Sequence, residues 1–102
     1  MAQFDLFRHA RSKRYPFLLD IQADLLRDLA THVVVPLTPV KRLAGKPIGR
    51  LNRVVTVEGV EHAILFQELA AIPAAAIGHA VGNLRGRRDD LIAALDLLFT
   101  GV

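Results

Sequence analysis

The chain has 102 residues, which is enough for one small domain and too few for two separate hydrophobic cores. Hydrophobic residues make up 52% of it, and 13 Lys and Arg residues against 10 Asp and Glu give a net charge of +3. It has no cysteine, which excludes disulfides, thiolate nucleophiles and cysteine-ligated zinc. We therefore expect a single domain over residues 1–102 in a reducing, cytoplasmic setting.

The first half of the chain is typical of β-strands, because apolar and polar residues alternate with a period of two. A first strand starts at Phe4 and runs to about Arg8. Residues 17–24 place apolar side chains on one face and mostly polar ones on the other, which predicts a half-buried strand. Residues 25–30 fit either a helical turn or a polar excursion. The β-branched run 32–37 contains a proline and predicts a strand with that proline at an end or an edge.

The second half begins with a stretch rich in proline and glycine, residues 38–50, which predicts a long basic loop or an irregular small sheet. Residues 54–57 and 60–66 then form a predicted β-hairpin around the turn Glu58-Gly59. The apolar run that follows, residues 69–77, is typical of a strand broken by its proline.

Three glycines keep residues 78–86 irregular in this interpretation, and a helix closes the chain. Asp89 and Asp90 suit its N-cap and first turn, and Gly101 follows where it stops. One apolar face of this helix would hold Leu91, Ile92, Leu95, Leu98 and Phe99. About five strands before one terminal helix predict a strongly bent sheet or small barrel, with the helix packed on it.

Basic residues gather in three clusters, and only Arg27 lies outside them. The clusters are Arg8, Arg11, Lys13 and Arg14; Lys41, Arg42, Lys46, Arg50 and Arg53; and Arg85, Arg87 and Arg88. This segregation favours an acidic partner, either nucleic acid or an acidic protein segment. The simpler alternative for each cluster is a solvated loop.

We find no pattern that indicates a catalytic, metal or cofactor site. The four histidines share no metal-ligand spacing, and the glycines at 78, 82 and 86 lack the ending of a phosphate-binding loop. One catalytic alternative stays open, in which His9, Arg11 and Arg14 assist metal-free cleavage of RNA and Tyr15 stacks on a base. The interpretation we prefer is an exposed loop that meets an acidic protein partner.

Several short segments, taken together, carry a family resemblance. They are Gln3-Phe4, Arg11 to Tyr15, Leu19 to Asp24, Val33 to Leu37, Ile72 to Gly78, Asp90-Leu91-Ile92 and Leu98 to Val102. In their order, spacing and end point they resemble a CcdB toxin over nearly the whole chain. The longest apolar run, from Leu69 to Ile77, is too short to span a bilayer, and the N-terminus lacks the pattern of a signal peptide.

The resemblance implies a mainly β, SH3-like barrel of the CcdB/MazF-like toxin fold with a C-terminal α-helix, assembled as a homodimer. It also implies a type II toxin–antitoxin system active in plasmid maintenance. The toxin would inhibit DNA gyrase by binding its A subunit and would not itself be an enzyme. An acidic, disordered segment of a CcdA-like antitoxin would neutralise it. The two proteins would repress their own operon, and the toxin would meet DNA only through the antitoxin complex.

Two sets of residues follow from the resemblance. The gyrase-binding residues would be Phe99, Thr100, Gly101 and Val102. The antitoxin-binding residues would be Arg8, Arg11, Lys13, Arg14, Tyr15, Lys41, Arg42 and Lys46. Family members typically end in Trp-Gly-Ile, so Thr100 departs from the pattern, and Arg88 stands in place of an acidic residue. Two alternatives stay open: a MazF-like endoribonuclease toxin, or a non-toxic CcdB relative that only binds antitoxin.

Overall fold

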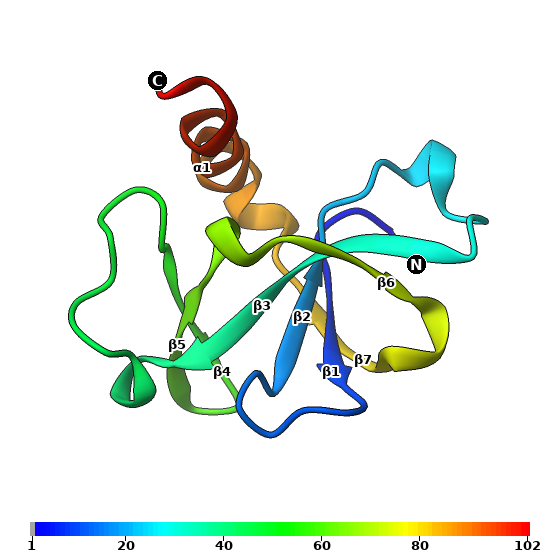
Figure 1. The fold of residues 1–102 in the computed structure, drawn as a ribbon, viewed down its shortest axis with the longest axis horizontal. Coiled ribbons are helices and arrows are strands. Elements are labelled where there is room, and N and C mark those ends of the chain that lie inside the picture. The colour runs from blue at the N-terminus through cyan, green and yellow to red at the C-terminus, as the bar shows by residue number, and fades with distance from the viewer. Residues whose placement is uncertain (1) are drawn as a thin grey trace.

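In the computed structural model, which describes residues 2–102, a curled antiparallel β-sheet is followed by one α-helix (Figure 1). The sheet order is β4-β5-β3-β2-β1-β7, and β6 pairs with β3. The elements are β1 (Asp5–His9), β2 (Phe17–Asp20), β3 (Thr31–Pro39), β4 (Val54–Val57), β5 (Val60–Ile64), β6 (Ala70–Pro73), β7 (Ile77–Asn83) and α1 (Arg88–Thr100). The predicted mainly β class with a C-terminal helix is confirmed, although the sheet has more strands than the sequence indicated.

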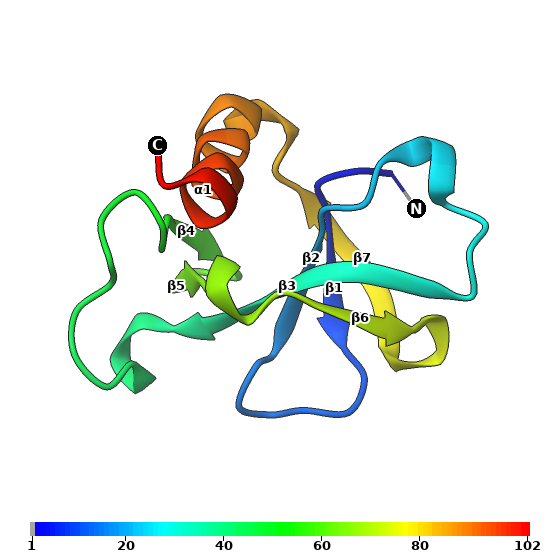
Figure 2. The ribbon, with the colours of Figure 1, turned by 45° about the horizontal axis from the view of Figure 1, so that its top comes forward.

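The long strand β3 connects the two parts of the sheet. One of its edges pairs with β2, while the other edge pairs with β5 through residues 37–39 and with β6 through residues 31–34. A 3₁₀ turn, Phe66–Glu68, joins β5 to β6 along that edge. Figures 1 and 2 show β3 crossing the molecule with β5 beside one end and β6 beside the other. Because β5 and β6 both pair with this edge of β3, the sheet bends into a half-barrel.

The core fills the inner side of this curl. Leu19, Leu37 and Phe66 are fully buried there, and α1 contributes Leu91 and Ala94. Each completely buried Leu or Phe side chain contributes about 1.5–3 kcal/mol of hydrophobic free energy. The helix is therefore held by these two buried residues, and Ile92, Leu95 and Leu98 pack against the same cluster at partial burial.

The predicted hairpin and the predicted helix end are both confirmed. Glu58 and Gly59, with φ of +51° and +78°, form the two-residue turn between β4 and β5. Positive φ at both positions gives a turn whose twist matches that of the strands. At the end of α1, Gly101 has φ of +79° and donates its N–H to the Leu97 carbonyl oxygen at 3.0 Å. This left-handed residue stops the helix where the sequence placed its end.

The strand predicted over residues 17–24 is confirmed only for Phe17–Asp20, and its predicted half-buried pattern is wrong. The strand ends at Asp20, and all four of its residues are buried. Leu19 faces the main core, while Leu18 pairs across the sheet with Phe7 on the opposite face. On that opposite face, Leu18 lines a pocket together with Val34 and Ile72.

The segment predicted to be irregular, residues 78–86, is a strand as far as Asn83. It pairs with β1, and two shifts of register accommodate its shape. A Cβ atom at Gly78 would lie 2.5 Å from the Arg8 carbonyl oxygen, so glycine is required for this close approach. The glycines that argued against a strand are thus tolerated because β7 is an edge strand whose pairing with β1 overrides local propensity.

Two segments whose structure the sequence left open are largely loops. The first two of residues 25–30 complete a 3₁₀ turn, Asp24–Leu26, and the others have no regular structure. Within residues 38–50, β3 ends at Pro39 and a 3₁₀ turn covers Val40–Arg42. The remainder is irregular, so the predicted long basic loop is the correct alternative.

Candidate functional site

The C-terminal tip is the first candidate surface, and it projects from the end of α1 (Figure 1). Phe99 is 67% exposed and Val102 is 81% exposed. Thr100 is the last residue of the helix, and its Oγ1 donates a hydrogen bond to the Asp96 carbonyl oxygen at 2.7 Å. The tip therefore presents two apolar side chains to solvent on either side of a polar residue.

The loop between β1 and β2 carries the first set of predicted antitoxin-binding residues. The backbone N–H of Arg11 donates to Nδ1 of His9 at 3.0 Å, and that of Tyr15 donates to Oγ of Ser12 at 3.1 Å. The Arg14 guanidinium lies over the Tyr15 ring, 5.4 Å from its centroid. These contacts give the loop a defined shape with its basic side chains outward.

The second basic segment, Lys41 to Lys46, lies against this loop. An Arg42 guanidinium N–H donates to the Lys13 carbonyl oxygen at 3.0 Å, and the Thr38 hydroxyl donates to the Arg14 carbonyl oxygen at 3.2 Å. Within residues 2–102, none of the ion pairs involves a basic side chain of either segment. We call the exposed basic residues of these two segments the basic surface: Arg11, Lys13, Arg14, Lys41, Arg42 and Lys46.

Arg8 has a different environment from the other predicted antitoxin-binding residues. Its Nη2 lies 2.6 Å from a carboxylate oxygen of Glu58, and its guanidinium lies over the Phe17 ring at 5.0 Å. Glu58 belongs to the β4–β5 turn, so this pair ties β1 to that hairpin. The structure thus engages Arg8 in an internal contact and leaves it outside the basic surface.

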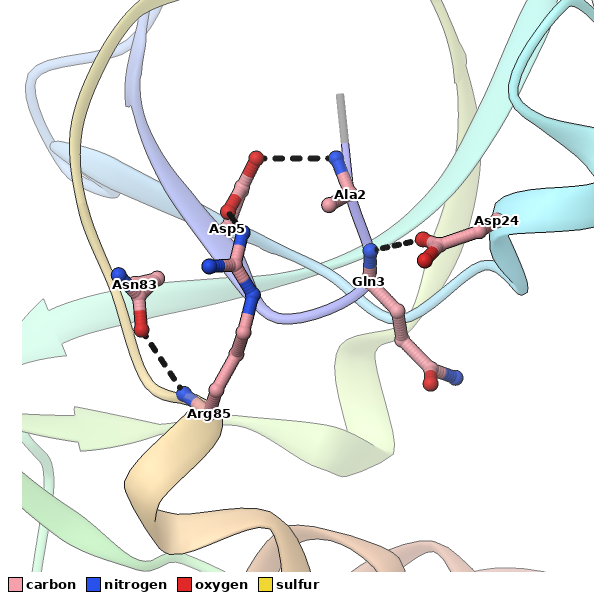
Figure 3. A network of polar contacts seen from close by, with 6 residues as sticks. All are labelled: Ala2, Gln3, Asp5, Asp24, Asn83 and Arg85. Atoms are coloured by element: carbon pink, nitrogen blue, oxygen red, sulfur yellow. Dashed lines mark hydrogen bonds and ion pairs between the residues drawn. The ribbon is translucent and has the colours of Figure 1, made fainter.

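Two arginines of the third basic cluster, Arg85 and Arg87, are also paired with nearby acids. Arg85 Nη2 lies 2.5 Å from one carboxylate oxygen of Asp5, whose other oxygen accepts the Ala2 N–H at 2.9 Å (Figure 3). The Asn83 side-chain oxygen accepts the Arg85 backbone N–H at 3.2 Å. This network fixes the connection between β7 and α1 beside the N-terminal segment.

Asp90 links α1 to the sheet in the same region. Its carboxylate lies 3.1 Å from Arg87 Nε and 3.6 Å from Arg53 Nη1. The predicted N-cap role belongs instead to Arg87, which makes no side-chain capping bond, so Asp89 and Asp90 act from the first turn. Acidic side chains there are favourable because the helix dipole is positive at that end.

Two pockets lie beside the basic surface and share Tyr15 and Glu68 in their linings. The apolar pocket has a volume of about 190 Å³ and is lined by His9, Tyr15, Leu18, Val34, Pro36, Glu68, Ala70 and Ile72. The basic pocket has a volume of about 220 Å³ and is lined by Arg14, Tyr15, Thr38, Arg42, Leu43, Ala44, Leu65, Gln67 and Glu68. The residues that line the two pockets thus come from four strands and from the β1–β2, β3–β4 and β5–β6 connections.

Asp20 is an ionisable side chain buried in the sheet at only 2% exposure. Burial raises the pKa of this carboxyl, while the Gln22 N–H that it accepts at 2.9 Å and the nearby His32 lower it. Gln22 in turn donates its side-chain N–H to the Leu26 carbonyl oxygen and accepts the Val33 N–H. These bonds shape the β2–β3 loop, and no group of side chains suited to a metal ion occurs within residues 2–102.

The raised pKa of Asp20 predicts a stability effect. Its folded pKa lies above the unfolded value, so its contribution is full below the unfolded pKa and is lost as pH rises through the folded pKa. We expect Asp20→Asn to raise the melting temperature at pH 7 and to change it little at pH 3, because the amide oxygen still accepts the Gln22 N–H. Thermal melts at both pH values check this. A lower melting temperature of the variant at pH 7 would contradict it.

Comparison with protein-family models identifies the chain. The model described as CcdB protein matches residues 3–101, which is nearly the whole chain. The chain belongs to the CcdB family. Its place in this family makes it a toxin of a toxin–antitoxin system, as the resemblance implied. Within residues 2–102, no helix is long and apolar enough to cross a membrane.

The fold of this CcdB-family chain is also that of a solved toxin structure. The Mycobacterium tuberculosis toxin MazF-mt6 matches it with a TM-score of 0.68 and 18% sequence identity, over 93% of this chain and 95% of that chain. At this identity the match shows a shared fold. The predicted CcdB/MazF-like toxin fold with its C-terminal helix is therefore confirmed.

The sequence of this CcdB-family chain did not point to several residues that line the two pockets or that expose large apolar side chains. Glu68, Ile72 and Thr38 were not selected, although each lines one or both pockets. Leu25, Leu26 and Leu29 were also missed, and their exposed fractions are 92%, 46% and 52%. The signal for the leucines was present, since they cluster in a segment where neither strand nor helix periodicity assigns them a buried face.

Proposed function

We propose that this CcdB-family toxin inhibits DNA gyrase by binding its A subunit through the C-terminal tip, and that a CcdA-like antitoxin neutralises it. Family membership over residues 3–101 supports the target class. The observation that carries the proposal is the exposure of Phe99 and Val102 at the end of a helix whose other end is anchored in the core. Exposed apolar side chains on a rigid support are typical of protein-binding sites.

Phe99 supports the tip's function even though Thr100 stands where the family typically has tryptophan. It precedes that position directly and offers an aromatic side chain that solvent largely surrounds. Complete burial of such a side chain against a partner contributes about 1.5–3 kcal/mol. Gly101, in the left-handed conformation, turns the chain so that Val102 leaves the helix axis. We infer that Phe99 is the main anchor and that Val102 adds a second apolar contact.

The antitoxin part of the proposal depends on the basic surface. Its six basic side chains carry no internal ion pair within residues 2–102, so they are available to the carboxylates of an acidic segment. We further propose that the chain is one domain, works as a cytoplasmic homodimer and represses its operon with the antitoxin. It acts by binding proteins and needs neither catalysis nor a cofactor.

Inducible expression in two isogenic hosts tests the proposal. One host has ordinary gyrase, and the other has a gyrase A subunit resistant to CcdB-type toxins. We expect growth arrest and DNA damage only in the first host, and rescue there when Gly101 and Val102 are deleted. The truncated chain at the same soluble level is the control. Killing in both hosts would point to another target, and harm to neither would favour a relative that only binds antitoxin.

The ribonuclease alternative is supported by the fold shared with MazF-mt6 and by Arg14 beside Thr38 in the basic pocket. Nδ1 of His9, however, already accepts the Arg11 N–H, and burial together with the charge of Arg11 lowers the His9 pKa. Purified protein with RNA in EDTA decides this point. We expect no cleavage; cleavage that Arg14→Ala abolishes would establish the ribonuclease and overturn the proposal.

A further inference from the structure

Three polar side chains are buried together where β2 and β3 run into the loop that connects them. Asp20, His32 and Gln22 are 2%, 3% and 8% exposed. The Ile21 N–H donates to the Val33 carbonyl oxygen at 3.2 Å, so the next residue, Gln22, lies at the level of His32. Ile21 packs against the main core, which places Asp20 and Gln22 on the opposite face, because side chains alternate along a strand. We call Asp20, Gln22 and His32 the buried polar cluster.

Gln22 ties the middle of the β2–β3 loop to the start of β3. Its side-chain N–H donates to the Leu26 carbonyl oxygen at 2.7 Å, and its side-chain oxygen accepts the Val33 N–H at 3.1 Å. Its backbone N–H donates to the Asp20 carboxylate at 2.9 Å. The loop carries the three exposed leucines described above, so this one amide group determines how firmly they are held.

His32 is the member of the buried polar cluster whose hydrogen bonding is incomplete. Its Nδ1 is buried and has no hydrogen-bond partner within residues 2–102. The other histidines differ, because Nδ1 of His9 and of His62 each has a backbone partner, and His79 is exposed. A buried polar atom that lacks a partner is unfavourable and favours any rearrangement that supplies one.

The charged groups that face His32 are few. On β2, Asp20 shares its face, and the charge of His32 lowers the pKa of that carboxyl. On β1, Asp5 also acts on Asp20, but it is paired with Arg85. On β6, Ile72 lies opposite His32, and residues 70–76 carry no ionisable side chain. The charged side chains of the loop itself are all exposed: Asp24, Arg27 and Asp28. A positive charge on His32 is therefore favoured by Asp20 and needs only a hydrogen-bond acceptor.

Protonation of His32 changes the hydrogen bonds that the cluster makes. Histidine gains its charge between about pH 8 and pH 5, and both ring nitrogens of the imidazolium are donors. The Gln22 side-chain oxygen, at the level of His32 on the neighbouring strand, is an acceptor for the new N–H. A charged donor forms a stronger hydrogen bond than the neutral Val33 N–H that this oxygen now accepts.

We propose that His32 is a pH-sensitive switch for the β2–β3 loop. When His32 gains a proton, the Gln22 amide turns to the imidazolium and leaves both Val33 and Leu26. The segment with the three leucines then loses its inner anchor. This inference concerns the loop alone and does not depend on the target of the C-terminal tip.

The two ends of the loop keep their own attachments in both states. Asp24 accepts the Gln3 N–H at one end, and the Ala30 carbonyl oxygen accepts the Ala74 N–H at the other (Figure 3 shows the first of these). Neither bond involves the buried polar cluster. The switch therefore changes how rigidly the leucines are presented and leaves the sheet folded.

Nuclear magnetic resonance of the full chain between pH 5 and pH 8 tests the proposal. The Cε1–H signal of His32 gives the midpoint of its protonation, and the Val33 amide reports directly on its bond to Gln22. We expect the Val33 amide to shift with the same midpoint, and its hydrogen-exchange protection, corrected for the intrinsic effect of pH, to fall at least about tenfold below it. A His32 that does not titrate in this range, or a Val33 amide that is indifferent to its titration, would overturn the proposal.

Two substitutions separate the switch from a general effect of pH. His32→Gln keeps a polar side chain that cannot gain a proton, and it should make the Val33 amide independent of pH over this range. His79→Gln, the same change at an exposed histidine of β7, is the matched control and should leave the transition as in the wild-type chain. A transition that persists in His32→Gln, or that His79→Gln abolishes, would assign the effect to another group.

Gln22→Ala gives a second measurement that leaves His32 unchanged. Loss of the amide removes the inner anchor at every pH, so trypsin should cleave after Arg27 at least about tenfold faster than in the wild-type chain. Cleavage after Arg50, an exposed residue of the β3–β4 loop, is the internal reference and should keep its rate. An unchanged rate at Arg27, or an equal rise at both sites, would overturn the role of Gln22 as the anchor.

Discussion

Replacing Thr100 with tryptophan is expected to raise affinity for the gyrase A subunit by about tenfold to a hundredfold, which corresponds to about 1.4–2.7 kcal/mol. Thr100 lies at the exposed end of α1, between Phe99 and Gly101, and its hydroxyl makes only a local bond to the Asp96 carbonyl oxygen. A tryptophan there would add the large, rigid apolar surface that dominates many protein interfaces. Since the side chain is solvent-exposed, the change should leave folding stability nearly unaltered.

Titration of the wild-type chain and the variant against the purified gyrase A subunit measures this effect, and the expression level that arrests growth gives a second reading. Asp96→Trp is the matched control, because Asp96 is an exposed residue one turn earlier on α1. A gain confined to Thr100→Trp locates the partner at the tip. Equal gains from both variants would show only that an exposed aromatic residue binds nonspecifically. No gain from either would count against the tip as the gyrase contact.

Leu91→Ala is expected to lower the free energy of unfolding by about 3 kcal/mol. Leu91 is fully buried at the first turns of α1 and belongs to the same core cluster as Leu19 and Phe66. Its truncation removes apolar contact and leaves a cavity at the place where the helix meets the sheet. Because the tip is carried by this helix, growth arrest should weaken together with stability.

Urea denaturation monitored by far-UV circular dichroism gives the unfolding free energy and its dependence on urea. The matched control is Ile92→Ala, the next residue, which is only partly buried against the core and should cost less. A loss below about 1 kcal/mol for Leu91→Ala would show that the helix is not anchored there. In that case the rigid support assumed for the tip would be wrong.

The sequence alone predicted those features that depend on local chemistry. The turn at Glu58-Gly59 and the helix end at Gly101 each rest on backbone conformations that short sequence patterns encode. The helix face was predicted less completely, because Phe99, which the sequence placed on the apolar face, is 67% exposed. The family resemblance then supplied what periodicity lacks, namely the toxin class and the CcdB/MazF-like fold, and the match to the CcdB family and the fold shared with MazF-mt6 confirmed both.

Other features were decided only by tertiary structure. The strand β7 forms despite its glycines because β1 offers an edge to pair with and because Gly78 permits a close approach to Arg8. Asp20 belongs to the face of residues 17–24 that the sequence predicted to be polar, yet all four residues of β2 are buried. In each case a partner distant in sequence outweighed the local pattern.

For the basic residues, too, the sequence predicted one part and the tertiary structure decided the other. Their sequence clusters predicted an acidic partner, but Arg8 pairs with Glu58 while Arg42 contacts Lys13, and neither contact is visible in linear spacing. Likewise, Tyr15 and Glu68 lie more than fifty residues apart in the sequence, yet both line the same two pockets. Charge and turn chemistry are properties of short segments and can be taken from the sequence. Which side chains meet depends on how the sheet curls, and that is set by the packing of all its strands at once.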